Sequence, residues 1–258
     1  MRTLLLAVAS LVAGACSADP AAAPSFRVAA ASDLSRAFDE LGKAFTAKTG
    51  TRAVVDFNSS GTLAKQIEQG APYGLFLAAN KDFADQAARS GKCAAASEQL
   101  YARGHLVAWT RSGTAPATIA DLADPKWKRI AIANPDHAPY GKAAKQALVK
   151  AGIFESLGER VVIADSVQAA MTWAREGSAD IALVSMSLAS VDTAGKAMTV
   201  DEALYEPLEQ TLIVCGAGAD AAGGAQLAAF VVSPAGREIL ARYGFSIATP
   251  PAPAVAKP

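Results

Sequence analysis

The stretch Asn134-Pro-Asp-His-Ala-Pro-Tyr-Gly141 decides the fold, because it joins an apolar segment to an amphipathic one. Residues 129–133 (RIAIA) predict a short buried strand, and residues 142–150 (KAAKQALVK) have helical spacing. Pro139 ends the strand, and Gly141 lets the backbone approach whatever lies above the helix start. The first turn of a helix points unpaired N–H groups outward and carries about half a unit of positive charge. This junction is therefore a candidate anion site, although an ordinary strand–helix turn has the same pattern.

Composition limits the classes of protein that this chain can belong to. It has 258 residues, enough for two lobes of ordinary size, and 52% of them are hydrophobic. The 24 acidic residues balance the 24 basic ones, which excludes a strongly basic nucleic-acid binder and an acidic disordered tail. An anion site here must be built from local dipoles.

The N-terminus predicts export. Residues 1–18 have a basic start, the apolar run Leu4–Val12 and then small residues, which is typical of a signal peptide. The run is too short for a permanent membrane span, and we expect no other span, so the mature protein is expected in the periplasm. Cys16 leaves open a lipid anchor. Residues 19–25 predict a linker, and the Pro/Ala-rich residues 249–258 a disordered tail.

Two further cysteines, Cys93 and Cys215, remain. In an oxidising compartment such a pair can form a disulfide, and two buried free thiols are the alternative.

Strand patterns alternate with helical ones along most of the chain, which predicts an α/β fold with parallel-rich sheets. The pattern restarts in the middle, so we expect two lobes. Residues 25–102 and 209–248 form lobe I, and residues 105–206 form lobe II. Two long strands, 104–110 and 209–215, connect them as the hinge. Ligands of open α/β sheets bind beyond the carboxyl ends of strands, which here means the cleft between the lobes.

Four strand-to-helix junctions face that cleft, and each places a small or hydroxyl residue at a helix start. They are residues 31–34 (ASDL), 58–62 (NSSGT), 139–141 (PYG) and 165–168 (DSVQ). Each serine can be a helix cap that accepts from N–H, or a donor to an anion, and the sequence does not separate the two. No lysine or arginine stands at a junction.

Six segments, in order, resemble the molybdate-binding periplasmic proteins of ABC importers. They are residues 30–34 (AASDL), 58–63 (NSSGTL), 69–73 (QGAPY), 134–141 (NPDHAPYG), 205–210 (YEPLEQ) and 242–245 (RYGF). The resemblance covers nearly all of the mature chain. It implies a type II two-lobed solute-binding fold that closes on molybdate or tungstate and delivers it to a membrane permease.

The resemblance also implies a ligand set. The first-lobe serine falls on Ser32 and the second on Ser60, while the second lobe contributes Tyr140 and the backbone of Val167. Some members have a ligand tyrosine where this chain has Ser185, so Tyr140 is expected to supply the phenol instead. Asp33 would repel a dianion, and we expect it to point away and cap its own helix.

Neutral donors favour a fully deprotonated dianion, because a protonated phosphate would leave its O–H unpaired. Sulfate, phosphate and an organic acid remain alternative ligands, although an organic acid usually calls for an arginine clamp. An enzyme is not expected, because His105 and His137 lack partners at metal-ligand spacing and His137 is expected to brace its turn. We expect no cofactor and a monomer that docks on the permease.

Overall fold

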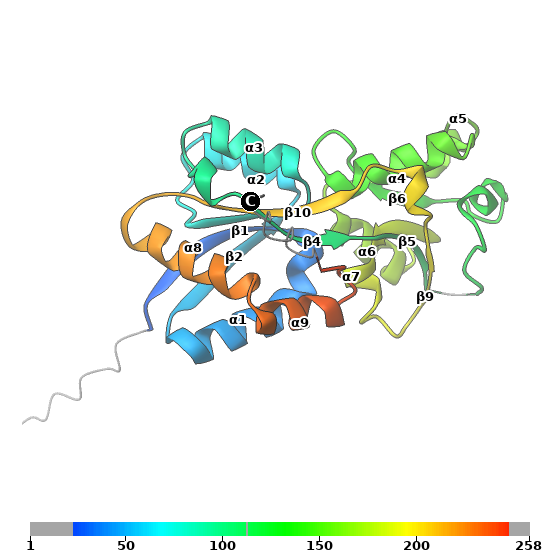
Figure 1. Cartoon of the computed structure of the whole chain (residues 1–258). Coiled ribbons are helices and arrows are strands. Elements are labelled where there is room, and N and C mark those ends of the chain that lie inside the picture. Colours follow the sequence, from blue (N-terminus) through cyan, green and yellow to red (C-terminus); the bar gives the residue numbers. More distant parts are fainter. Residues whose placement is uncertain (1–22, 112, 248–258) are drawn as a thin grey trace, which may run out of the picture.

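The computed structural model describes residues 23–111 and 113–247, which form two lobes lying side by side (Figure 1). Each lobe contains a five-stranded sheet, in the order β2-β1-β3-β10-β4 or β7-β6-β8-β5-β9. The predicted signal peptide, Cys16 and the 249–258 tail lie outside the described residues. Among the residues described, no helix is long and apolar enough to cross a membrane. The predicted two-lobed α/β fold is confirmed.

The sheet of the first lobe is mixed. Its central β1 pairs in parallel with β2 and β3, whereas β10 runs antiparallel to β3 and β4. The direction of β10 is reversed because this strand returns from the second lobe. The strands are β1 (Ser25–Ala31), β2 (Arg52–Asn58), β3 (Leu75–Ala78), β4 (Gln99–Gly104) and β10 (Leu208–Val214).

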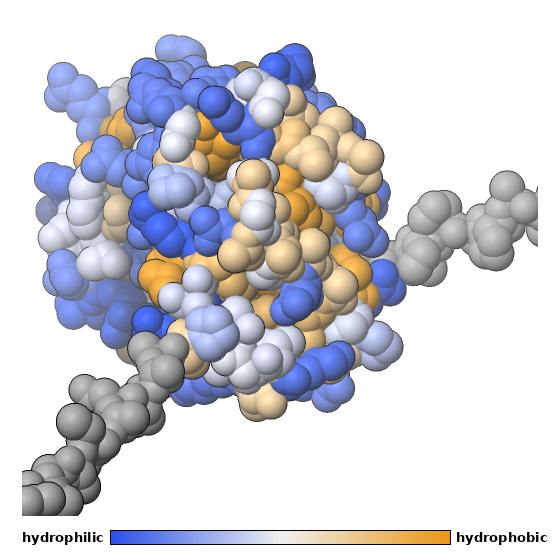
Figure 2. Space-filling view, turned by 90° about the vertical axis from the view of Figure 1, so that its left-hand side faces the viewer, coloured by the Kyte–Doolittle hydropathy of each residue, from blue (hydrophilic) through white to orange (hydrophobic). Residues whose placement is uncertain are grey.

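Helices cover both faces of this sheet because side chains alternate along its strands. On β1, Val28 and Ala30 pack towards α1 (Ser35–Thr49), α8 (Gly218–Val231) and α9 (Pro234–Arg242). Ala29 packs on the other side, with α2 (Ser60–Glu68) and α3 (Lys81–Arg89). Seen from the first-lobe side, hydrophilic residues surround paler and hydrophobic ones near the centre of the view (Figure 2).

The second lobe is built the same way. Parallel β6 lies between β7 and β8, and antiparallel β5 and β9 complete the sheet. The strands are β5 (Leu106–Thr110), β6 (Ile130–Ala133), β7 (Val161–Ala164), β8 (Ile181–Ser185) and β9 (Lys196–Thr199). Its helices are α4 (Pro139–Lys150), α5 (Phe154–Leu157), α6 (Val167–Glu176) and α7 (Met186–Ala189). Short 3-10 turns occur in both lobes, at Ser32–Leu34 (η1), Ala95–Ser97 (η2), Ile119–Ala123 (η3), Gly158–Arg160 (η4) and Glu202–Leu204 (η5).

The expected single strand 104–110 is wrong, because the chain crosses between the lobes there. β4 ends in the first sheet at Gly104 and β5 begins in the second at Leu106. His105, between them, contacts both lobes: its Nδ1 lies 2.5 Å from Glu202 and its Nε2 lies 2.7 Å from Ser246 Oγ. The return crossing runs alongside, since the Leu106 N–H donates to the Tyr205 hydroxyl at 3.1 Å.

Cys93 and Cys215 form a disulfide. The sequence had left open either this bond or two buried free thiols. Cys215 directly follows β10, and Cys93 follows α3, so the bridge lies within the first lobe. It joins positions separated by 122 residues, and that segment includes the whole second lobe.

Removing this disulfide should lower the melting temperature. Cross-linking a loop of this length restricts the unfolded chain, and such bonds typically contribute about 2–4 kcal/mol. For a domain of this size that is roughly 5–15 °C. We expect this shift between wild type and a Cys93→Ala/Cys215→Ala variant in thermal unfolding by circular dichroism. Alkylation of both cysteines without reductant, seen by mass spectrometry, would contradict the assignment.

Candidate functional site

A cavity of about 10 Å³, lined mostly by buried residues, lies where the two lobes meet. Pockets for drug-sized organic ligands usually measure about 300–1,000 Å³, so this one is far too small for such a ligand. All four junctions line it, and they bring together the four ligand candidates predicted from the sequence, Ser32, Ser60, Tyr140 and Val167. The other lining residues are Ala31, Asp33, Asn58, Ser59, Ala79, Ala138 and Pro139.

The two serines at the start of α2 have different roles. Ser59 is the N-cap, and its Oγ accepts from the Thr62 N–H at 3.4 Å. Ser60 is the first residue of the helix, and its Oγ accepts from the Ala79 N–H at 2.9 Å. Because that bond uses an oxygen lone pair, the Ser60 hydroxyl hydrogen stays free to donate into the cavity.

Ser32 also offers a donor. It is the first residue of η1, its side chain is buried, and its Oγ has no hydrogen-bond partner among the described residues. Leaving a buried hydroxyl unpaired costs about 1–3 kcal/mol. A ligand oxygen in the cavity would remove that cost.

The second lobe presents main-chain N–H groups to the same cavity. At α6 the Ser166 Oγ caps the Ala169 N–H at 3.2 Å, and Val167 is the first residue of the helix. At α4 the first residue is Pro139, which has no N–H, so Tyr140 supplies the first amide of that turn. First-turn amides have no partner inside their own helix, and the helix dipole favours a negative charge there.

The Tyr140 phenol does not take the place expected for it. Its hydroxyl lies against β4 in the first lobe, where a Cβ added at Gly104 would come 2.1 Å from the oxygen. The same Cβ would lie 2.8 Å from Gln210 Nε2, so the phenol and the amide share one narrow slot. Only glycine at position 104 leaves room for this side chain. A ligand role for Tyr140 therefore rests on its main-chain N–H.

Asp33 does not cap its helix, contrary to expectation. It is the middle residue of the short η1 turn, whose N-cap position is Ala31, and the turn has no side-chain cap. The carboxyl is fully buried, and neither oxygen has a partner at full hydrogen-bond geometry among the described residues. Burial raises the pKa of Asp33 to about 7, whereas the donor groups of Tyr140 and Gln210 and nearby backbone N–H groups, close by but outside full hydrogen-bond geometry, lower it.

Ser185 belongs to a contact between the lobes and is not among the residues that line the cavity. It caps α7 by accepting from the Leu188 N–H at 3.4 Å, and its Oγ lies 3.0 Å from Ser187 Oγ. Ser187 donates to the main-chain carbonyl of Asp33 at 2.7 Å. The serine pair therefore holds the second lobe against η1.

His137 links the lobes on the other side of the cavity. Its Nδ1 lies 2.8 Å from Ser59 Oγ, and its carbonyl accepts from the Gly61 N–H at 2.8 Å. A Cβ at position 61 would come 2.8 Å from His137 Cβ and its carbonyl oxygen, so the Ser-Ser-Gly sequence permits this close approach. The sequence predicted bracing within the turn, whereas the structure shows bracing between lobes.

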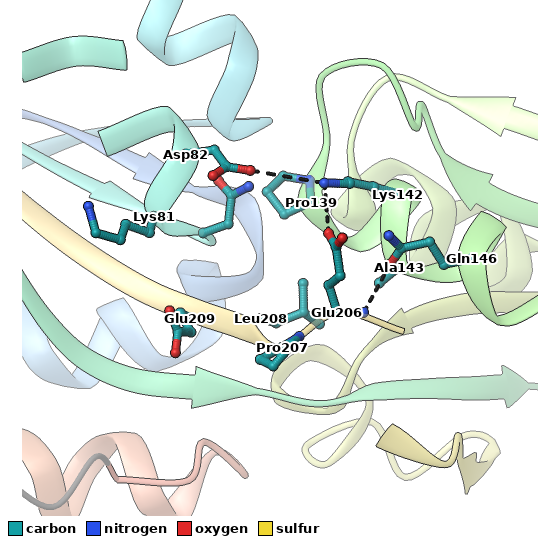
Figure 3. Close-up of a pocket in the computed structure, with 11 residues that line it drawn as sticks. Lys81, Asp82, Pro139, Lys142, Ala143, Gln146, Glu206, Pro207, Leu208 and Glu209 are labelled. Carbon is teal, nitrogen blue, oxygen red and sulfur yellow. Dashed lines mark hydrogen bonds and ion pairs between the residues drawn. The ribbon is translucent and has the colours of Figure 1, made fainter. Parts of the chain in front are cut away.

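Lys142 lies outside the cavity, in a separate hollow at the edge of the lobe boundary (Figure 3). Its Nζ is 2.7 Å from Glu206 and 4.0 Å from Asp82 of the first lobe, and the hydrogen bond with Glu206 raises the pKa of Lys142. All three side chains are substantially exposed, so these pairs contribute at most about 1 kcal/mol.

The cavity is thus lined by neutral donors. No lysine or arginine is among its lining residues in the part of the chain that the structure describes. Two hydroxyls and the amides of helix starts converge from both lobes, which suits a small anion with several oxygens.

Sequence reasoning missed the residues behind this first layer. Gln210, Tyr101 and Ser187 are buried polar residues far from the junctions in sequence. The Tyr101 hydroxyl donates to Gln210 Oε1 at 3.2 Å, and the strand register shifts between Gln210 and Thr211. A polar glutamine inside the apolar strand 209–215 was the signal available.

Comparison with known proteins agrees with this geometry. A family model described as a bacterial extracellular solute-binding protein matches residues 26–246. The molybdate-binding protein ModA of Rhodobacter capsulatus is 32% identical over 229 residues, covering 88% of this chain and 90% of the relative. ModA of Azotobacter vinelandii is 31% identical over 246 residues, covering 93% and 96%.

The solved structure of the Azotobacter vinelandii periplasmic molybdate-binding protein superposes with a TM-score of 0.81. It is 29% identical and covers 87% of this chain and 100% of that chain. The resemblance seen in the sequence is confirmed. The chain belongs to the bacterial extracellular solute-binding proteins and, among them, to the molybdate-binding periplasmic family.

Proposed function

We propose that this chain captures molybdate or tungstate between its lobes in the periplasm and delivers it to the permease of an ABC importer. Ser32 and Ser60 donate through their hydroxyls, and Tyr140 and Val167 through their main-chain N–H groups. The protein acts as a monomer, needs no cofactor and catalyses no reaction. The names of the relatives support the ligand and the role as a binding protein.

The convergence of the four junctions on one small cavity carries this proposal. Main-chain N–H groups cannot accept a hydrogen bond from a protonated ligand, but an ionised Asp33 carboxyl in the cavity lining can, so the donor set alone does not separate molybdate from phosphate. An organic acid fits less well, because the cavity is small and has no arginine among its described lining residues. The described residues contain no cluster of three or more histidine, cysteine or carboxylate side chains that could hold a metal ion for catalysis.

Ligand-dependent thermal unfolding should identify the oxyanion. With molybdate or tungstate at a thousandfold over its dissociation constant, binding should stabilise the protein by about 4 kcal/mol. For a domain of this size that raises the melting temperature by roughly 8–16 °C. Sulfate and phosphate at the same millimolar concentration serve as controls. If only sulfate or phosphate raises the melting temperature, the proposed substrate is wrong. If none of the four anions raises it, the proposal of anion binding is wrong.

Replacing Ser60 or Ser32 by alanine should weaken binding, and Ser60→Ala should also lower stability because it leaves the buried Ala79 N–H without its acceptor. Each variant loses one hydrogen bond to a charged ligand, about 1.5–3 kcal/mol, or roughly 10- to 100-fold in dissociation constant. Isothermal titration calorimetry measures this change.

Ser233→Ala is the matched control, because Ser233 caps α9 by accepting from the Gly236 N–H and lies far from the cavity in the first lobe. It should lower the melting temperature and leave affinity unchanged. Ser60→Ala and Ser233→Ala with the same affinity would show that Ser60 is a structural residue and not a ligand.

A further inference from the structure

Asp33 is held from two sides by the second lobe. Its main-chain carbonyl accepts from Ser187 Oγ of α7 at 2.7 Å. Its carboxyl lies near the hydroxyl of Tyr140, which α4 inserts into the first lobe beside Gly104. Asp33 also lines the cavity next to Ser32. The same residue therefore contacts the ligand cavity and the closed boundary between the lobes.

Within residues 23–111 and 113–247, no positive charge faces this carboxyl. The groups that act on its pKa besides burial are Tyr140, Gln210 and the N–H groups of Asp33 and Leu34, all of them neutral. Buried Tyr101 of β4 is the other ionisable group that feels its charge, and its own pKa is raised by burial and by Asp33. The turn η1 also packs on α1, α6, α7 and β2. Helix α7 carries no charged residue, and the charged residues of the other three elements are exposed or half-exposed.

A dianion in the cavity would make the ionised carboxyl still less stable. Two like charges a few ångströms apart in a buried site repel strongly, and this raises the pKa of the carboxyl. Burial, offset in part by the neighbouring hydrogen-bond donors, brings the pKa of Asp33 to about 7 in the closed structure. A bound oxyanion adds to that shift in the same direction.

The lobes must separate before a ligand can enter, because the cavity is lined by largely buried residues of both lobes. On separation Asp33 loses Tyr140 and Ser187 and gains water. A solvated aspartate has a pKa of about 3.9. The carboxyl is therefore ionised in the open form at neutral pH.

We propose that closure of the lobes on the oxyanion takes up one proton, and that the Asp33 carboxyl carries it in the closed complex. This inference rests on the proposed function. The proton removes the repulsion between carboxylate and dianion, and it is released when the lobes open.

The direction of the pH dependence follows from linkage. The bound form holds more protons than the free form between the open and the closed pKa of Asp33, so affinity falls as pH rises through that range. We expect a loss of roughly tenfold per pH unit from about pH 5.5 to at least pH 7.

Calorimetric titration with molybdate in two buffers of different ionisation enthalpy, at pH 6.5, measures the protons taken up. Wild type should take up close to one proton per ligand. Asp33→Asn should take up close to none, and its affinity should not vary with pH. Asp39→Asn, an exposed aspartate on α1, is the matched control and should behave as wild type. His137→Gln tests a second titratable group at the lobe boundary and should keep the uptake.

Tyr140→Phe gives a second test that does not remove Asp33. Because the Tyr140 hydroxyl lowers the pKa of Asp33, its loss should extend proton uptake to higher pH. Uptake at pH 7.5 should exceed that of wild type, while the main-chain N–H of residue 140 remains.

Binding without proton uptake in wild type would overturn the inference and leave the proposed function intact. Uptake that persists in Asp33→Asn, or disappears in His137→Gln, would assign the proton elsewhere and also overturn it. If Tyr140→Phe takes up protons over the same pH range as wild type, the inference is also overturned. No heat with molybdate, tungstate or sulfate would overturn the proposed function itself, and this inference with it.

Discussion

In the function proposed here, taking a small anion out of water is the constraint on which the rest of this structure depends. A buried charge is tolerated only when surrounding groups replace its hydration. This chain supplies those groups as hydroxyls and helix-start amides, which already need partners because no intrahelical bond uses them. Ser32 is buried and its Oγ has no hydrogen-bond partner among the described residues, so the protein also lacks a partner at this position. In the proposed complex, the ligand and the protein would satisfy each other's hydrogen bonds.

Donors on one sheet edge could cover only one side of a tetrahedral ion. Two similar lobes, joined by adjacent crossings at His105 and Tyr205, place helix starts on opposite sides of one cavity. Close approach of the lobes then depends on small residues. Gly61 admits the His137 carbonyl, and Gly104 admits the Tyr140 ring.

The buried polar residues behind the cavity add a second property. Asp33 and Gln210 come from two elements of the first lobe, and Tyr140 of the second lobe joins them across the boundary. Burying ionisable groups changes their proton affinity, so lobe position and protonation are linked wherever such a cluster spans a moving boundary. The site is thus defined by the closed arrangement as much as by its individual residues.

The sequence by itself determined the local features: the alternation of strands and helices, the four junctions and the four ligand candidates. The alternation and the junctions follow from hydrophobic period and from turn residues, which act over a few neighbours. The four ligand candidates came from the resemblance to the molybdate-binding family. Local sequence did not predict that the strand divides at His105, that β9 forms, or that some strands run antiparallel. Strand partners are far apart in the chain, so local patterns do not reveal them. Only the tertiary structure decided that Ser59 caps the helix while Ser60 keeps its hydroxyl hydrogen for donation, that the Tyr140 phenol turns away, and that Asp33 is buried with no cation beside it among the described residues. Hydrogen-bond direction and desolvation depend on what other segments place nearby, and local sequence does not encode that.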